Sequence, residues 1–509
     1  MSTAAIVFCP FVAMAGFSGR EASIPPLAPA LLKGCLNEEG ISAVAHDFNL
    51  SFHQEFTDND FVSLVAWITT PGVKIELDLY KKYQKFVSRC VDQVLFDLPE
   101  VVCVSLFSHQ SQRFAEDFCY RIKTKSNVHV IVGGGGVGTH LAEYEKIWAD
   151  LAVDSGLADA ALLGEAELII ADLVTLKEPG VHRAPQLYNE ELKDLPVPNF
   201  DDYDLDSYGA RERIKLPITA SKGCVRKCSF CDVASIWPKF RYRRGENVAK
   251  EMITVYQKYG IKNFSFTDSL LNGGLKPFRE MNQILSDCLP GILSYEGQFI
   301  CRNSSAMPPS DFELMKAGGC KYVSIGIESG SESVRNHMKK EFSSDDLDYT
   351  AQQLIEKEIL QSWNIIVGYP TETDDDWQQT LDLIHRYRRY SELVKIQPIG
   401  VFQMLQDTPI TTKESLNELN IELHNTHGYS EYNWISGLNP TNDLPTRVRR
   451  WHELVDLCEK YNMLYLSPVR IKQRTLILQQ QLDFYEKKST YPVFQLREQS
   501  FQEPTNFID

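Results

Sequence analysis

The chain has 509 residues and a mass of 58.0 kDa, which is too long for one ordinary hydrophobic core and predicts two or three domains. A hydrophobic fraction of 43% and a charged fraction of 24% are typical of folded globular proteins and exclude global disorder. The formal net charge of −16 opposes nucleic acid or anionic lipid as a general partner. No apolar run reaches the roughly 18 to 20 residues of a membrane span, and residues 1–12 lack the basic start of a secretory signal, so we expect a cytoplasmic protein.

Short apolar runs alternate with amphipathic stretches up to Gly180. The expected helices are residues 27–39, 76–96 and 111–125. The expected strands are residues 4–9, 42–48, 101–106, 128–132 and 160–163. Apolar strands separated by helices are typical of a parallel sheet that is covered on both faces. We therefore predict a doubly wound α/β domain over residues 1–180.

Proline, aspartate and asparagine dominate the next segment and predict a linker over residues 181–209. A second series of strands and helices follows and predicts a partial (β/α)6 barrel over residues 210–420. Its expected strands are residues 214–220, 263–267, 294–300, 322–327, 362–367 and 393–398. The helical spacing of residues 448–461 then predicts a small, mainly helical C-terminal region over residues 421–509.

Three cysteines, Cys224, Cys228 and Cys231, lie close together directly after the first expected barrel strand. Barrels of this kind carry their active sites at the C-terminal ends of the strands. Three thiolates on one loop can hold three corners of an iron–sulfur cubane and leave the fourth iron open to another ligand. Basic side chains of the same loop favour the thiolate form. These are Lys222, Arg226 and Lys227.

A zinc site and ordinary core thiols are the other interpretations of this triplet. A structural zinc ion takes four ligands, and no histidine lies between His182 and His337 to complete a local set. The other nine cysteines are scattered, and in a chain without a secretory signal we expect most of them to be reduced core thiols. They are Cys9, Cys35, Cys90, Cys103, Cys119, Cys288, Cys301, Cys320 and Cys458.

The CxxxCxxC spacing, with the aromatic Phe230 just before the third cysteine, resembles the defining motif of the radical S-adenosylmethionine superfamily. The resemblance implies a [4Fe-4S] cluster on the three cysteines and S-adenosylmethionine chelated to its open iron. It implies reductive cleavage to a 5′-deoxyadenosyl radical that abstracts a substrate hydrogen, with an external electron donor such as flavodoxin or ferredoxin. Phe230 is then implied to lie against the adenine.

Two later strand ends resemble binding motifs of the same superfamily. Residues 264–269 are similar to the second-strand motif that receives the methionyl amino group, although the usual GGE tripeptide is absent. The residues implied there are Thr267, Asp268 and Ser269. Residues 326–331 are similar to the fourth-strand motif, in which Glu328 and Ser329 would meet the ribose hydroxyls.

Two further contacts with S-adenosylmethionine are predicted in this region. Arg302 follows the third barrel strand and could hold the methionyl carboxylate through a bidentate pair, with a structural ion pair as the alternative. Residues 366–373 resemble the fifth-strand GxPxET segment, in which Gly368 would let the backbone approach the adenine.

The N-terminal region resembles the cobalamin-binding domain that is fused to one subgroup of this superfamily. The resemblance also covers residues 24–32, Asp47, the linker residues 195–198 and residues 237–243. Glycines at the C-terminal edge of a doubly wound sheet let a large flat cofactor approach the backbone. The implied cobalamin contacts are Ser105, Ser108, Gly133, Gly134, Gly135, Gly136, Gly164 and Glu165. Because the chain has no DxHxxG motif, no axial histidine from that motif is implied.

A dinucleotide site and a purely structural domain are the alternatives to cobalamin. Gly133, Gly135 and Gly138 satisfy the G-x-G-x-x-G pattern. That fingerprint belongs after the first strand of its domain, whereas this run follows the fourth expected strand.

The combined resemblance implies a cobalamin-dependent methyltransferase that acts on an unactivated carbon of a small molecule or peptide. The alternatives are cobalamin-dependent rearrangement or cyclisation, and methylthiotransfer with a second cluster in the N-terminal region. A non-catalytic iron–sulfur module would not need the downstream motifs. The pattern identifies no catalytic side chain, and we expect substrate contacts at the barrel mouth, the domain interface and the segment from His424 to Asn442.

Overall fold

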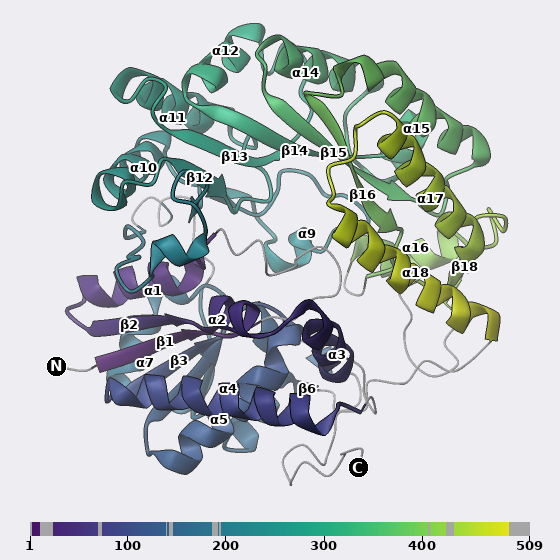
Figure 1. Cartoon of the computed structure of the whole chain (residues 1–509). Helices are drawn as coiled ribbons and strands as arrows, with labels where there is room; N and C mark the ends of the chain where they lie inside the picture. The colour runs from purple at the N-terminus through teal and green to yellow at the C-terminus, as the bar shows by residue number, and fades with distance from the viewer. Residues whose placement is uncertain are drawn as a thin grey trace. The chain divides into compact units, whose positions relative to one another are not determined.

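The computed structural model describes residues 3–10, 24–69, 74–138, 140–141, 146–185, 192, 195–405, 408–423 and 432–487. The chain divides into two compact units, residues 1–217 with 492–509 and residues 218–491. Two six-stranded sheets form their centres (Figure 1). The tail after Lys488 and the first part of the segment from His424 to Asn442 lie outside the described residues. No helix in the described ranges is long and apolar enough to cross a membrane.

The first sheet confirms the predicted doubly wound fold. Its strand order is β2-β1-β3-β4-β7-β8, and every neighbouring pair is parallel. The order reverses beside β1, which is the point where such sheets bind ligands at their C-terminal edge. The strands are β1 (Thr3–Phe8), β2 (Ser42–Asp47), β3 (Val101–Ser105), β4 (His129–Gly133), β7 (Ala160–Leu163) and β8 (Gly180–Arg183).

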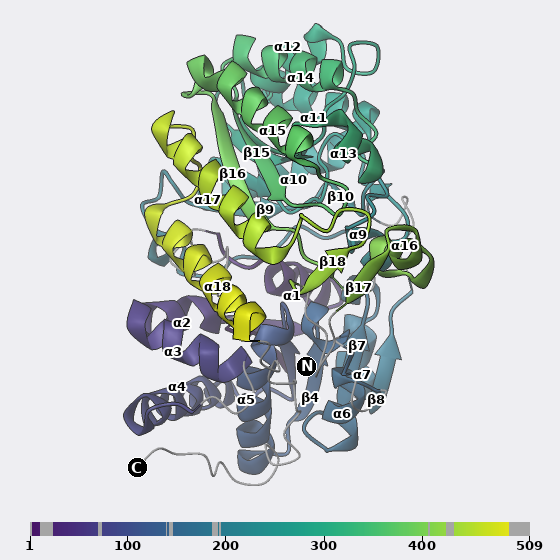
Figure 2. The same cartoon turned by 90° about the vertical axis from the view of Figure 1, so that its right-hand side faces the viewer.

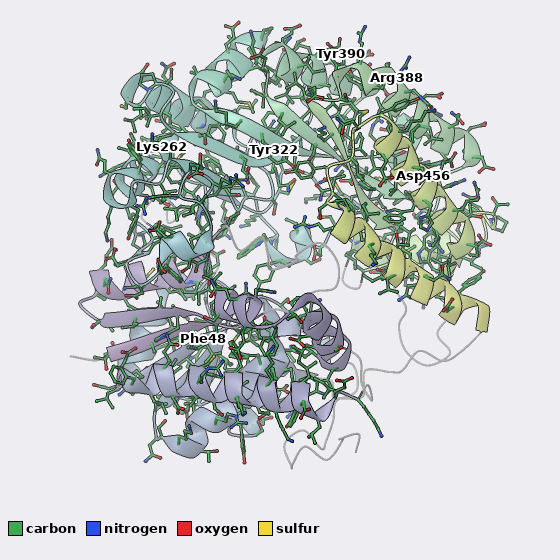
Figure 3. All side chains as sticks on the ribbon, viewed as in Figure 1. Phe48, Lys262, Tyr322, Arg388, Tyr390 and Asp456 are labelled. Atoms are coloured by element: carbon green, nitrogen blue, oxygen red, sulfur yellow. The ribbon has the colours of Figure 1, made fainter. Side chains whose placement is uncertain are left out.

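Side chains of these strands alternate between two hydrophobic cores, one on each face of the sheet. Val7 belongs to the core with Phe48, which is labelled in Figure 3 and packs against Phe114 and Phe118. The next residue back, Ile6, belongs to the opposite core. The first face is covered by α2 (Phe48–Glu55), α3 (Asp58–Thr69), α4 (Leu77–Phe96), α5 (Gln112–Lys125) and α6 (Trp148–Asp154), and the second by α1 (Leu27–Glu38) and α7 (Ile170–Leu176).

The segment predicted as a linker contributes to the first unit. Strand β8, whose last three residues fall in that segment, pairs with β7, because the edge of β7 offers free backbone groups that composition does not reveal. Further on, Asp202 pairs with Lys33 and accepts a hydrogen bond from the Ala45 amide at 2.7 Å. The hydroxyl of Tyr208 donates to the Asp47 carboxylate at 2.6 Å. These contacts cover the outer edge of β2.

The second sheet has the order β16-β15-β14-β13-β12-β9, as expected for a partial barrel of six strand–helix units. The pairs from β12 to β16 are parallel. The strands are β9 (Lys215–Ile218), β12 (Asn263–Phe266), β13 (Ser294–Phe299), β14 (Cys320–Glu328), β15 (Leu360–Val367) and β16 (Val394–Val401). The helices along the outside are α10 (Gly245–Tyr259), α11 (Leu275–Cys288), α12 (Pro309–Ala317), α14 (Ser344–Glu356) and α15 (Asp374–Tyr387).

The C-terminal region is more varied than the predicted helical segment. It contains a hairpin of β17 (Ile421–Leu423) and β18 (Trp434–Ser436), followed by α17 (Leu444–Lys460) and α18 (Pro468–Lys487). Helix α17 packs beside β16 (Figure 2). After α17, the Ile396 amide of β16 donates to the Met463 carbonyl at 2.6 Å, and the Tyr465 amide donates to the Ile396 carbonyl at 2.9 Å. The chain therefore closes the outer edge of β16.

Candidate functional site

The three cysteines lie on the loop after β9, at the C-terminal edge of the second sheet. Cys228 is buried, and Cys224 and Cys231 are half-buried. The short strands β10 (Ser221–Lys222) and β11 (Arg241–Tyr242) pair at the base of this loop. At its centre, the Ser229 amide donates to the Met338 carbonyl at 3.0 Å, and the Ser229 carbonyl accepts from the Ile410 amide at 2.7 Å. The loop is thus fastened to two distant parts of its own unit.

Asp268 fixes the start of the cysteine loop. Its carboxylate accepts hydrogen bonds from the Ala220 amide at 2.9 Å and from the Ser221 hydroxyl at 2.5 Å. Burial raises the pKa of Asp268 to about 7. The adjacent predicted residues Thr267 and Ser269 are exposed. The structure therefore gives Asp268 a structural partner in the loop and leaves its two neighbours accessible.

Lys340 brings a positive charge to the thiols, and no motif in the sequence marks this residue. Its ammonium group is buried, donates to Glu328 Oε1 at 3.0 Å and lies 5.9 Å from the centre of the Phe230 ring. Burial raises the pKa of the Cys228 thiol to about 11, and the charge of Lys340 acts in the opposite direction. Lys340 therefore connects the cysteine loop with the carboxylate predicted for the ribose.

The three basic residues that the sequence placed beside the thiols have other surroundings. Arg226 pairs with Glu341. The Lys222 ammonium lies 5.4 Å from the centre of the Trp237 ring, and Lys227 is exposed. A positive charge that favours thiolate thus also comes from Lys340, which lies in a distant segment of the sequence.

The described residues contain no group of three His, Cys, Asp or Glu side chains arranged around a single metal ion. A mononuclear zinc site therefore has no ligand set within them. A cubane is larger than one ion, and each of its cysteines binds a different iron, so its thiolates need not converge on one point. Three thiols on one fastened loop fit the cluster better than they fit zinc.

Glu328 ends β14 with strained backbone geometry. Its φ is 64°, in the left-handed region, and the register between β14 and β15 shifts at this residue. Such a conformation costs a residue other than glycine on the order of 1 to 3 kcal/mol and is concentrated at functional sites. A shift of this kind re-aims a side chain, here toward Lys340. Ser329 directly after it is fully buried.

The end of β15 makes a turn at Gly368, whose φ is 81°. A Cβ atom at this position would lie 2.2 Å from Cγ of Arg447. The absence of a side chain at Gly368 therefore makes room for Arg447. The family resemblance explains the glycine differently, as space for the adenine to approach the backbone. The next residue, Tyr369, places its hydroxyl 2.9 Å from that of Ser229 in the cysteine loop.

An aromatic cluster joins the cysteine loop to the C-terminal hairpin. The ring centres of Phe230 and Phe402 are 6.3 Å apart, and those of Phe402 and Trp434 are 5.8 Å apart. Tyr369 also contacts Phe402, at 5.1 Å between ring centres. Phe230 thus lies in an apolar aromatic setting at the strand ends, as expected for a ring that meets a nucleobase.

Arg302 lies near the cysteine loop, but its guanidinium contacts backbone. Nη2 donates to the carbonyls of Asn272 at 3.1 Å and Gly273 at 3.2 Å. Burial and the charge of Arg226 lower the pKa of Arg302, and the Cys224 thiol acts in the opposite direction. The described residues provide no carboxylate that forms an ion pair with Arg302, so the structural alternative for this residue finds no support in them.

The glycine run after β4 packs tightly against the loop after β3. A Cβ atom added at residues 134, 135 or 136 would lie 2.3, 2.8 or 2.4 Å from the carbonyl oxygen of residue 106, 107 or 108, respectively. Gly134 also has a φ of 98°. Contact between the two loops therefore requires these glycines whether or not a cofactor binds.

The other predicted cobalamin residues lie at the ends of the same strands. Ser105 ends β3, the Ser108 hydroxyl donates to Gln110 at 3.4 Å, and Gly133 ends β4. Gly164 follows β7 and is exposed with a φ of 91°, and Glu165 next to it is buried. The structure thus gathers all eight predicted residues at the C-terminal edge of β3, β4 and β7.

Five cysteines of the first unit lie in its interior, namely Cys9, Cys35, Cys90, Cys103 and Cys119. Burial raises the pKa of four of these thiols, those of Cys9, Cys90, Cys103 and Cys119. For Cys103 the pKa rises to about 12. Thiolates are the form that binds iron, and an apolar core disfavours them. Four of the five also lie within helices or strands, whereas the three cluster cysteines share one loop, so the set does not resemble a site for the second cluster that methylthiotransfer would need.

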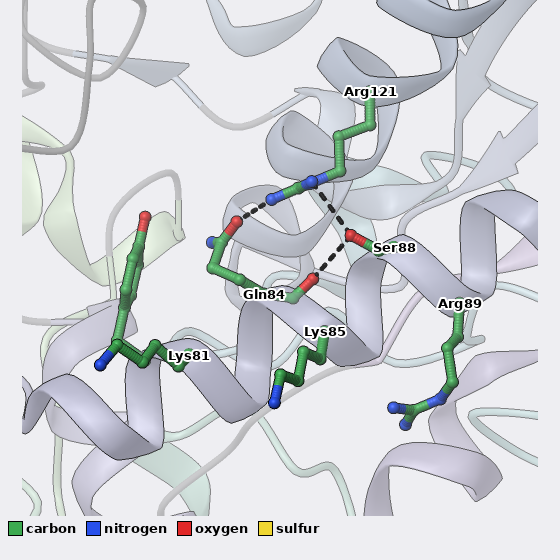
Figure 4. Close-up of a pocket in the computed structure, with 7 residues that line it drawn as sticks. Lys81, Gln84, Lys85, Ser88, Arg89 and Arg121 are labelled. Carbon is green, nitrogen blue, oxygen red and sulfur yellow. Dashed lines mark hydrogen bonds between the residues drawn. The ribbon is translucent and has the colours of Figure 1, made fainter.

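A hollow of about 700 Å³ lies on the outer helices of the first unit (Figure 4). Its lining includes Lys81, Lys85 and Arg89 of α4. Arg121 of α5 donates to the Ser88 hydroxyl at 3.0 Å and also bonds to Gln84. The hollow is a helix surface, separate from the strand ends that gather the predicted cofactor residues.

Comparison with known proteins finds a family match within the second unit. The family profile of the radical SAM superfamily matches residues 218–384. The bacteriochlorophyllide d C-12(1)-methyltransferase of Chlorobaculum tepidum is 26% identical over 48% of this chain and 49% of its own length. A tRNA-2-methylthio-N(6)-dimethylallyladenosine synthase of Legionella pneumophila is 26% identical over 49% of this chain and 61% of its own length. The chain thus spans 49% and 61% of the length of these two relatives.

Two solved structures share the fold over most of this chain. TsrM from Kitasatospora setae, described as a radical S-adenosylmethionine methyltransferase with cobalamin and a [4Fe-4S] cluster bound, covers 84% of this chain and 78% of its own at 14% identity and a TM-score of 0.57. OxsB, a cobalamin-dependent radical enzyme solved with aqua-cobalamin and S-adenosylmethionine, covers 92% of this chain and 62% of its own at 14% identity and the same TM-score. At this identity the likeness concerns the fold alone.

Proposed function

We propose that this chain is a radical SAM enzyme with its domain at residues 218–384. It would use a cluster on Cys224, Cys228 and Cys231 to start a cobalamin-dependent methyl transfer to an unactivated carbon. The observation that carries the proposal is the buried pair of Lys340 and Glu328, which joins the cysteine loop to the strand end predicted to bind S-adenosylmethionine. An isolated iron–sulfur module would need no such link.

The residues around the cluster would divide the binding of S-adenosylmethionine among them. Glu328 would accept hydrogen bonds from the ribose hydroxyls, and Lys340 would hold that carboxylate in place through its own hydrogen bond. Lys340 and Arg302 are the cations available to the methionyl carboxylate. The exposed Thr267 and Ser269 could receive the methionyl amino group. A cluster held by the three cysteines would supply the one electron that reductive cleavage of S-adenosylmethionine to the 5′-deoxyadenosyl radical requires.

The protein's contribution to this chemistry is binding, orientation and exclusion of water. Phe230 and Phe402 give the adenine an apolar surface beside the cluster loop. The Ser229 backbone bonds hold that loop in place beside the strand ends. A one-electron donor of the ferredoxin or flavodoxin type is required outside the chain.

Cobalamin is the cofactor that best fits the first unit. Its sheet carries the predicted contacts at one C-terminal edge beside the switch in strand order, where doubly wound sheets bind large cofactors. The fold likeness to TsrM and OxsB, both solved with cobalamin, supports this assignment. When bound, cobalamin would carry the methyl group to the substrate radical.

Two alternatives share the same radical chemistry. Rearrangement or cyclisation would use the same site without transfer of a methyl group. Methylthiotransfer is supported by relatives such as the Legionella synthase. That reaction needs a second cluster, which the buried thiols of the first unit disfavour. The substrate, a small molecule or a peptide, would be selected outside these residues.

The test uses the full chain, reconstituted without oxygen in the presence of iron, sulfide and hydroxocobalamin. With a strong reductant and S-adenosylmethionine carrying a deuterated methyl group, we expect 5′-deoxyadenosine and a labelled methyl group recovered with the corrinoid. Deoxyadenosine without labelled corrinoid would support rearrangement instead. If wild type forms no more deoxyadenosine than Cys228→Ala, the radical proposal is wrong.

A further inference from the structure

We infer that the C-terminal region positions the turn at residues 368–370 for binding S-adenosylmethionine, with Asn442, Arg447 and Arg450 as positioning residues. The inference rests on the proposed function and assigns binding of S-adenosylmethionine to a region in which the sequence suggested only substrate contacts. All three side chains are fully buried and come from the segment that begins α17. Each contacts the turn or a residue that holds it.

Asn442 holds the backbone of the turn directly. Its Nδ2 group donates to the carbonyl of Gly368 at 3.2 Å and to that of Tyr369 at 2.9 Å. Nearby, Nδ2 of Asn439 donates to the Glu372 carbonyl at 2.7 Å. Successive carbonyls of the turn are therefore oriented by amide donors from the C-terminal region. An amide is suited to this task because one nitrogen donates two hydrogen bonds.

Arg450 acts on the same turn through Glu372. Glu372 Oε1 accepts from the Gly368 amide at 2.9 Å and from Arg450 Nη1 at 2.9 Å. The other end of the guanidinium donates to Asp374 at 2.7 Å. Arg450 and Glu372 are both fully buried, so removal of Arg450 would leave the Glu372 carboxyl group without its cationic partner. The Gly368 amide thus has a fixed partner.

Arg447 fills the space that Gly368 leaves. Its Cγ atom occupies the position next to the missing Cβ, and its guanidinium lies 3.8 Å from the centre of the Trp434 ring. Nη2 donates to the Trp434 carbonyl at 2.9 Å. Trp434 in turn contacts Phe402, which contacts Phe230 of the cysteine loop. Arg447 therefore packs between the turn and the aromatic cluster and holds the two together.

These contacts fix the distance between the turn and the cluster loop. Tyr369 lies between them, with its carbonyl bonded to Asn442 and its hydroxyl beside Ser229. A ligand that contacts the cluster and the turn at the same time requires a fixed separation between them. Small displacements of the groups that hold a reacting ligand slow its reaction strongly. Loosening the C-terminal support should weaken that ligand without removing the cluster.

The test measures binding of radiolabelled S-adenosylmethionine to the cluster-reconstituted full chain by equilibrium dialysis, together with iron content and melting temperature. Asn442→Ala and Arg450→Lys should bind about tenfold more weakly than wild type, at unchanged iron content. Leu454→Ala is the matched control, because Leu454 is fully buried on the same helix α17. It should lower the melting temperature and leave the dissociation constant unchanged.

The outcomes separate this inference from the proposed function. If Asn442→Ala and Arg450→Lys bind as tightly as Leu454→Ala, the region only stabilises the fold and the inference is overturned. Should either variant fail to fold, Asn439→Ala replaces it, because Asn439 is half-buried and donates to the Pro370 carbonyl of the turn at 3.5 Å; unchanged affinity there overturns the inference too. If cluster-loaded wild type binds no S-adenosylmethionine, the proposed function itself is wrong.

Discussion

The Lys340 ammonium lies 3.0 Å from Glu328 Oε1, and the two side chains are only 7% and 6% exposed. A buried ion pair that loses one partner leaves an uncompensated charge. We therefore expect Lys340→Met to lower the free energy of unfolding by about 3 to 5 kcal/mol and to weaken binding of S-adenosylmethionine. Chemical denaturation and equilibrium dialysis measure the two effects.

A matched variant separates charge from shape at this pair. Glu328→Gln in the Lys340→Met background removes the second charge and should recover part of the stability but none of the affinity. A single Lys340→Met change that leaves both quantities at wild-type values would contradict the role given to Lys340.

The cysteine triplet makes the simplest prediction. Replacing Cys224, Cys228 and Cys231 together by Ala should remove the brown chromophore and about four irons per chain after anaerobic reconstitution. Replacement of the buried Cys320 is the control, since the Cys320→Ala variant should retain the iron content of the wild-type protein. Full iron content in the triple variant would show that the cluster lies elsewhere.

Asp268 predicts a pH dependence of stability. Burial raises its pKa from 3.8 to about 7, so the folded state holds this proton more tightly than the unfolded state. The stabilisation is complete below about pH 4 and is lost as the pH rises toward 7, by an amount on the order of 4 kcal/mol. Asp268→Asn keeps an acceptor for the Ala220 amide and should flatten this slope.

Melting temperatures at pH 5 and pH 8 decide this point. Glu372, whose pKa is also raised to about 7, should preserve a similar slope of its own in both proteins. The difference between wild type and Asp268→Asn therefore isolates the Asp268 contribution. Parallel curves for the two proteins would rule out a buried, weakly acidic Asp268.

The glycine run predicts an unequal response to methyl groups. Gly136→Ala would place a Cβ atom 2.4 Å from the Ser108 carbonyl oxygen, so it should destabilise the first unit and lower cobalamin uptake. Gly138→Ala meets only the Leu163 side chain at 3.6 Å and should be tolerated. Equal melting temperatures for the two variants would mean that the loops do not pack in this way.

The coordination of cobalamin gives a spectroscopic prediction. The first unit lacks a DxHxxG motif, so hydroxocobalamin taken up during reconstitution should reach about one equivalent per chain without a histidine from that motif on cobalt. Reduced to cobalt(II), it should give a base-off spectrum and paramagnetic resonance without nitrogen splitting. Nitrogen splitting would refute the ligand argument alone, whereas failure to bind cobalamin would refute the methyltransferase proposal.

The sequence by itself determined the fold class, because periodicity and spacing are local properties. The apolar strands before Gly180 and the six later strands all appear near their predicted residues, and the cysteine spacing identified the loop after β9. Strand β8 escaped prediction because its four residues carry no apolar pattern and depend on the free edge of β7.

Only the tertiary structure decided which distant side chains complete the site. Lys340 follows Glu328 by 12 positions and reaches it through an intervening helix, and Asn442 is 74 positions from Gly368. The tertiary structure also gave Asp268 and the glycine run structural partners that their motifs do not show. The physical reason is that burial, charge pairing and backbone contact arise between segments when strands align, and local sequence does not encode that alignment.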